Sequence, residues 1–139
     1  MKAIKSLAIS LAILAGAGSV QAAQGFTLEC NLKQLNTNGG FGDKMYLSFV
    51  EGWTNPAAFD YAINKLHKSP IPIKLVSNEG KRVRFSWELK GLKFRDGTSI
   101  GRVLYKGSVD KKTLHIRMES IVPSNVGRYF TEGQCQKIK

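Results

Sequence analysis

Between Arg82 and Leu89 the chain alternates strictly between polar and apolar side chains. The apolar residues are Val83, Phe85, Trp87 and Leu89. The polar residues that alternate with them are Arg82, Arg84, Ser86 and Glu88. A two-residue period places each set on one face of a β-strand, so the apolar face needs a core to pack against. The same period recurs before and after this stretch, with short turn signals between. This pattern predicts one all-β, mainly antiparallel domain of about seven strands.

The first 22 residues are typical of a secretory signal peptide. Lys2 and Lys5 precede an apolar run over residues 7–17, and small side chains follow at Ser19 and Ala22. The run is shorter than the ~20 residues that a bilayer span requires. We therefore expect a signal peptide over residues 1–22 and a single β-rich domain over 23–139, with no transmembrane segment after cleavage. The expected location is periplasmic or secreted.

The chain has two cysteines, Cys30 and Cys135, near the two ends of the expected domain. In an oxidising compartment they should form a disulfide that joins the first strand to the last. A sheet whose terminal strands meet is most simply a closed or partly open barrel, although a β-sandwich with stapled terminal strands also fits. Two distant cysteines and two histidines are too few for a metal site, so neither a metal nor a cofactor is expected.

One segment departs from the two-residue period. Asn55 and Pro56 resemble the start of a helix, and Ser69 followed by Pro70 resembles its end. Phe59, Ile63 and Leu66 recur between them at helical spacing. The sequence therefore predicts one short amphipathic helix that plugs an end of the barrel or covers an open sheet edge, with membrane binding as a weaker alternative.

Turn signals suggest registers for two hairpins. A loop over Asn78–Gly80 predicts that Lys74 lies opposite Arg84 on the outer face. A turn over Asp110–Thr113 predicts that Lys106 lies opposite Arg117 on the same face, with Ser108 opposite His115. The predicted inward pairs are Leu75–Val83, Ile73–Phe85 and Ile71–Trp87 in the first hairpin, and Val109–Leu114, Gly107–Ile116 and Tyr105–Met118 in the second.

The closing strand should begin near Arg128. One face of this strand carries Tyr129, Thr131, Gly133 and Cys135, and the other carries Arg128, Phe130, Glu132 and Gln134. The face of Cys135 is the less apolar one, which does not suit a buried disulfide. Glycine within a strand often marks a bulge. A bulge at Gly133 is therefore expected to bring Phe130 to the side of Cys135.

Basic residues dominate the outer face of the second half. Loss of the leader with Lys2 and Lys5 changes the formal net charge from +11 to +9. Like charges opposite each other across strands are mildly destabilising, so stability alone does not account for them. The predicted binding residues for an anionic partner are Lys74, Arg82, Arg84, Lys106 and Arg117, with Lys90, Lys93, Arg95 and Arg102 nearby.

The expected function is therefore binding of an anionic glycan, a lipid headgroup or an acidic protein, without enzymatic activity. The plain alternative is that long cationic side chains only keep the sheet soluble. A second functional hypothesis is a barrel that carries a small apolar ligand, lined by Phe49, Phe85, Trp87, Tyr105 and Met118. An ordinary core explains these residues better, because a chain this short needs its aromatic side chains for stability. A third is an inhibitor of a secreted enzyme.

Two further classes are disfavoured by the pattern. Ser108 and His115 could form a dyad, but an exposed cross-strand pair has no pocket and no oxyanion hole, so no catalytic residue is assigned. The aromatic residues alternate into the core and leave no stacking platform for single-stranded nucleic acid. The oligomeric state is not predicted.

Overall fold

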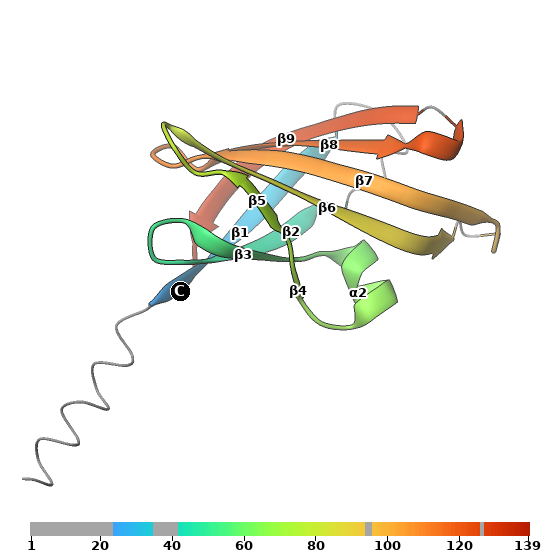
Figure 1. Cartoon of the computed structure of the whole chain (residues 1–139), viewed down its shortest axis with the longest axis horizontal. Coiled ribbons are helices and arrows are strands. Elements are labelled where there is room, and N and C mark those ends of the chain that lie inside the picture. The colour runs from blue at the N-terminus through green and yellow to red at the C-terminus, as the bar shows by residue number, and fades with distance from the viewer. Residues whose placement is uncertain (1–23, 35–41, 94–95, 126) are drawn as a thin grey trace, which may run out of the picture.

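The computed structural model describes residues 24–34, 42–93, 96–125 and 127–139. In these residues nine strands form one antiparallel sheet in the order β4-β3-β2-β1-β9-β8-β7-β6-β5, which curls into a nearly closed barrel (Figure 1). The strands are β1 (Gly25–Gln34), β2 (Lys44–Val50), β3 (Thr54–Phe59), β4 (Ile71–Pro72), β5 (Lys74–Ser77), β6 (Arg82–Lys93), β7 (Ser99–Asp110), β8 (His115–Val122) and β9 (Gly127–Lys137). A helix, α2 (Tyr61–His67), and a short 3-10 turn, η2 (Pro123–Asn125), complete it. The predicted all-β class and barrel form are confirmed.

One chain segment brings the two sides of the sheet together. β4 and β5 follow one another in the chain but lie at opposite edges of the sheet. Ile71 of β4 pairs with Ala58 of β3, whereas β5 pairs with β6. Between them the Ile73 N–H donates to the Pro56 carbonyl at 3.0 Å. The sequence predicted one strand before the Asn78–Gly80 loop, and the structure has two there, β4 and β5. β3, which lies where a helix was predicted, is a further strand. These two additions account for nine strands where about seven were predicted.

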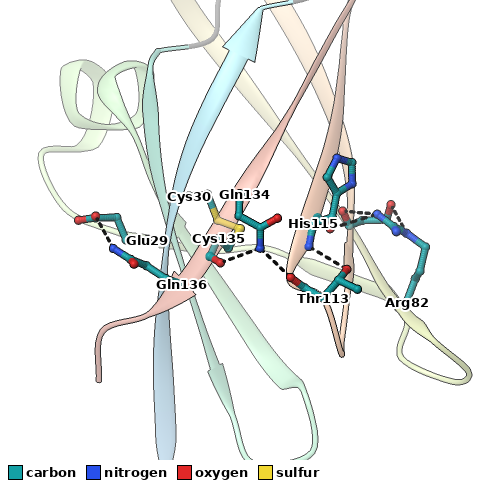
Figure 2. The surroundings of a disulfide bond; sticks show 9 residues. Glu29, Cys30, Arg82, Thr113, His115, Gln134, Cys135 and Gln136 are labelled. Atoms are coloured by element: carbon teal, nitrogen blue, oxygen red, sulfur yellow. Dashed lines mark hydrogen bonds between the residues drawn. A yellow bond between two sulfur atoms is a disulfide. The ribbon is translucent and has the colours of Figure 1, made fainter.

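β1 and β9, far apart in the sequence, are neighbours. Cys30 lies directly opposite Cys135 in their antiparallel register, and the two form a disulfide with an S–S distance of 2.05 Å (Figure 2). Both side chains are buried. The structure therefore contains the predicted disulfide and the predicted contact between the first and last strands.

The interior is built from the alternating apolar residues of every long strand. Trp53 packs edge-on against Phe26 and Phe49, with ring centroids 4.8 and 5.0 Å apart. Ile63 of α2 is fully buried, and this helix lies below one end of β6 and β7 (Figure 1). The helix packs against β3 and β6 at this end of the barrel, which agrees with the two placements that the sequence left open, a barrel end or an open sheet edge.

The helix begins later than predicted. Asn55, Pro56 and Phe59 belong to β3, and the cap is Asp60, whose Oδ1 accepts a hydrogen bond from the Ile63 N–H at 2.9 Å. An aspartate in this position satisfies a helix N–H that has no partner within the helix. The Asn55–Pro56 start signal was wrong because Pro56 is placed in a sheet, where its carbonyl is used by Ile73.

The predicted register of the first hairpin is also wrong. Lys74 lies opposite Ser86 rather than Arg84, and Leu75 lies opposite Phe85. An irregularity at Val76 then sets Ser77 opposite Arg84. The predicted inward pairs Ile71–Trp87 and Ile73–Phe85 do not form because the chain around residues 71–73 bonds to β3 instead.

The second hairpin shows the same kind of shift. Lys106 lies opposite Glu119, Ser108 opposite Arg117, and Val109 opposite Ile116. The loop lies one residue further along the chain because Leu114 adopts a left-handed conformation (φ 62°) and donates its N–H to the Asp110 carbonyl. Moving the loop by one residue changes each pairing by two, so every side chain keeps its face but changes its partner.

The bulge predicted at Gly133 does not occur. β9 pairs with β1 and β8 in continuous register through this position, Thr131 is buried, and Phe130 faces outward. A Cβ at residue 133 would overlap with the Asn31 carbonyl oxygen of β1. The glycine therefore permits close approach of two strands rather than a change of phase.

Some predictions fall on residues outside the described ranges. They include the signal peptide over 1–22 and Arg95. The strands on either side of residues 35–41, β1 and β2, are antiparallel neighbours.

Candidate functional site

The outer face of the sheet is hollowed where β5, β6, β7, β8 and β9 lie side by side. This open hollow has a volume of about 470 Å³. On β7 it is lined by Lys106, Gly107 and Ser108. We call it the basic hollow, and its lining residues are Val76, Arg84, Phe85, Ser86, Lys106, Gly107, Ser108, Arg117, Met118, Glu119 and Phe130.

Three of the predicted binding residues meet in the basic hollow. Arg84 comes from β6, Lys106 from β7 and Arg117 from β8, and all three side chains are exposed. Arg84 and Arg117 occupy one row across the strands with Ser108 between them, so two strand spacings, about 9.5 Å, separate their backbones. The fourth predicted residue, Lys74, is exposed on β5 but does not line the hollow.

Arg82 is half-buried at the edge of this cluster and braces it. Its Nε donates to Ser108 Oγ at 3.0 Å, and its Nη2 donates to the carbonyl oxygens of Ser108 and His115 at 3.1 and 3.3 Å. Figure 2 shows the Arg82 side chain directed toward His115. Arg82 thus links β6, β7 and the start of β8, and holds the central serine of the hollow.

The guanidinium groups in this region repel one another. Burial lowers the pKa of Arg82 below its usual range, and the nearby charges of Arg117 and Arg84 lower it further, while the charge of Asp110 acts in the opposite direction. Arginine remains protonated despite such shifts. The arrangement therefore concentrates positive charge that a bound anion would offset.

The cations of the hollow lack anionic partners within the described parts of the chain. The ion pairs found there are Lys44–Glu29, Lys90–Glu88, His115–Glu132 and Arg128–Glu119, none of which includes a predicted binding residue. Glu119 lines the hollow, but its carboxylate is 2.9 Å from Arg128 Nε. Lys106 and Arg117 therefore have no ion-pair partner among the described residues.

Two apolar side chains flank the cations, at positions that the sequence did not bring together. Val76 of β5 is 54% exposed and Phe130 of β9 is 42% exposed. Phe130 could have been found from the plain alternation of β9, had no bulge been assumed at Gly133. Alternation with Leu75 and Ser77 places Val76 on the outer face as well, but nothing in the sequence indicates that a hollow would connect it to Phe130.

The hypothetical Ser108–His115 dyad is not assembled. Ser108 lies opposite Arg117, and His115 lies opposite Gln134. The hydroxyl of Ser108 accepts from Arg82, while His115 Nε2 is 3.6 Å from Glu132 Oε2. The register shift of the second hairpin thus separates the two groups.

The residues proposed to line an interior ligand site pack against each other. Trp87 stacks on Tyr105 with centroids 5.1 Å apart, and Phe85 stacks on Trp87 at 6.1 Å. A Cβ at Gly107 would overlap with Met118 and Phe85. This packing leaves no spare room at the level of Gly107 and favours an ordinary core there.

Comparison with protein-family models, curated proteins and solved structures gave no match. In the described ranges no helix is long and apolar enough to cross a membrane. The same ranges hold no group of three or more histidine, cysteine, aspartate or glutamate side chains positioned for a metal ion.

Proposed function

We propose that this protein acts by binding an anionic partner through the basic hollow. The observation that carries the proposal is that Arg84, Lys106 and Arg117 line one hollow and have no ion pair among the described residues. Exposed cations usually only interact with solvent. Cations gathered from three strands around a concave surface are better placed to recognise an anion, because their charges act together.

The signal-like leader and the buried Cys30–Cys135 disulfide support a place of action outside the cytoplasm. We include export to the periplasm or the medium in the proposal. The available partners there include polyanionic glycans, lipid headgroups and acidic proteins.

A pair of matched triple variants tests the proposal. The first is Arg84→Gln, Lys106→Gln and Arg117→Gln in the hollow. The second is Lys90→Gln, Lys93→Gln and Arg102→Gln, which removes the same charge from exposed positions of the same sheet outside the hollow. Binding would be measured for sulfated heparin fragments, phosphatidylglycerol vesicles and polyglutamate at two salt concentrations.

The hollow triple variant should lose between about threefold and about 150-fold in affinity for the partner class that binds, since each of three exposed ion pairs contributes ~0.2–1 kcal/mol. The loss should be largest at low salt, where screening is weakest. The control triple should retain most of the affinity. Equal losses in both variants would mean that only net charge matters, and the proposed site would be rejected.

A second candidate function is carriage of a small ligand inside the barrel. One observation favours it: the indole N–H of Trp87 is buried and has no hydrogen-bond partner among the described residues. Such a group costs free energy unless an acceptor reaches it. Native mass spectrometry of the gently purified protein at high salt tests this, because an enclosed apolar ligand resists screening. Recovery of only the bare chain would count against a carrier.

A further inference from the structure

The basic hollow is apolar at both ends and basic in the middle. Val76 lies at the β5 end, Phe130 at the β9 end, and the three cations lie on the strands between them. We infer that its occupant is an extended acidic segment of a partner protein, with an apolar side chain on each side of two acidic ones. This inference rests on the proposed function and specifies the partner.

The dimensions of the hollow set the length of that segment. Five adjacent strands span four spacings of about 4.8 Å, or about 19 Å from β5 to β9. An extended chain advances about 3.3 Å per residue, so seven residues cover the distance. Side chains at alternate positions point to one face, which gives the order apolar-x-acidic-x-acidic-x-apolar.

The cations match this order. Acidic side chains two residues apart are separated by about 7 Å along an extended chain. The Arg84 and Arg117 backbones are about 9.5 Å apart, and arginine side chains are long enough to converge on such a pair. Guanidinium groups also bind carboxylates through two parallel hydrogen bonds, which favours aspartate and glutamate as the anionic groups.

The lining of the hollow favours a peptide over a membrane surface. The cations line an open hollow that is flanked by the exposed side chains of Val76 and Phe130. An extended peptide can present apolar and acidic side chains to these groups in turn, whereas lipid headgroups would engage the cations alone. The negative charge of Glu119 is already offset by Arg128, so it does not exclude an acidic segment.

Two peptides of identical composition test the order directly. The first is Leu-Ser-Asp-Ser-Asp-Ser-Leu and the second is Asp-Ser-Leu-Ser-Leu-Ser-Asp, both with blocked ends. Titration of the isotope-labelled, disulfide-bonded domain by NMR would give the affinity, down to the millimolar range, and the location of binding. We expect the first peptide to bind about tenfold more tightly, with amide shifts centred on Ser86, Gly107 and Ser108.

Two double variants separate the apolar contribution from general surface effects. Val76→Ser with Phe130→Ser should abolish the preference for the first peptide. Tyr61→Ser with Ile138→Ser removes one exposed aromatic and one exposed aliphatic side chain outside the hollow, and should leave the preference unchanged. Circular dichroism of both variants checks that the fold is retained.

The outcomes distinguish this inference from the proposed function. If both peptides bind equally and the hollow triple variant weakens both, the apolar ends play no part and the inferred segment is wrong, while the anionic site stands. If neither peptide binds but phosphatidylglycerol vesicles bind through the same three cations, the occupant is a membrane surface. If no anionic probe binds, both the inference and the proposed function are overturned.

Discussion

Arg82 and Ser108 are joined by a 3.0 Å hydrogen bond from the guanidinium Nε to the serine hydroxyl, and the same guanidinium also bonds to the Ser108 carbonyl. This contact makes Arg82 a positioning residue for the hollow, in contrast to Arg84, which is exposed and makes no such bonds to the part of the chain that the structure describes. The two arginines lie on the same strand and the same face, so they can be compared directly.

Replacement of Arg82 by Lys should destabilise the protein by about 1–2 kcal/mol, because a lysine cannot reproduce the forked bonds to β7 and to His115. Arg84→Lys should change stability by less than ~0.5 kcal/mol. Both variants keep the charge. Urea unfolding provides the measurement, and an equal loss in the two variants would show that Arg82 does not brace the sheet.

Removal of the disulfide should cost about 4–5 kcal/mol. Cys30 and Cys135 are 105 residues apart, and the chain-entropy model gives this value for a loop of about that length. The measurement is the denaturant midpoint of Cys30→Ala with Cys135→Ala, compared with the oxidised wild type. Dithiothreitol should lower the midpoint of the wild type and leave that of the double variant unchanged. A double variant as stable as the wild type would contradict the prediction.

Gly133→Ala should be among the most damaging single changes, with a loss of more than about 3 kcal/mol. The added Cβ meets backbone atoms of Asn31 and Leu32, which can move only if β1 and β9 separate. Gly107→Ala is the comparison, because its Cβ meets the side chains of Met118 and Phe85, which can rotate. The midpoint temperature of thermal unfolding should therefore be lower for Gly133→Ala than for Gly107→Ala. The reverse order would refute the explanation.

Asp60 should make stability depend on pH in the acidic range. Burial raises the pKa of this carboxyl, against the lowering effect of backbone hydrogen bonds from Ile63 and Ala62. A carboxyl whose pKa is raised on folding stabilises the folded state fully below its unfolded pKa, and this contribution is lost as pH rises through the folded pKa. Asp60→Asn keeps a helix cap and removes the titration.

The free energy of unfolding of Asp60→Asn, relative to that of the wild type, should therefore increase between pH 3 and pH 7. Urea unfolding at several pH values measures it. A difference that stays constant across this range would contradict the raised pKa.

Tyr105 offers a second measurement: burial raises the pKa of its hydroxyl, and the charge of Asp60 raises it further. Ultraviolet titration should show a lower Tyr105 pKa in Asp60→Asn.

The faces of the residues in β6, β7 and β8 could be predicted from the sequence. Phe85, Trp87 and Tyr105 are inside, and Arg84, Lys106 and Arg117 are outside, as the alternation indicated. The pairing of Cys30 with Cys135 was predictable for a related reason, since two cysteines in an oxidising compartment have only one intramolecular partner each.

Only the tertiary structure decided which side chains lie opposite one another. A register shift of two residues leaves every face unchanged, so the pattern around Lys106 fits Arg117 and Glu119 equally well. The choice is made by the left-handed conformation of Leu114 in one hairpin and by the division of β4 from β5 in the other. Such turns depend on hydrogen bonds and packing from distant strands. The basic hollow, which joins five strands, therefore could not be derived from the order of residues along any one of them.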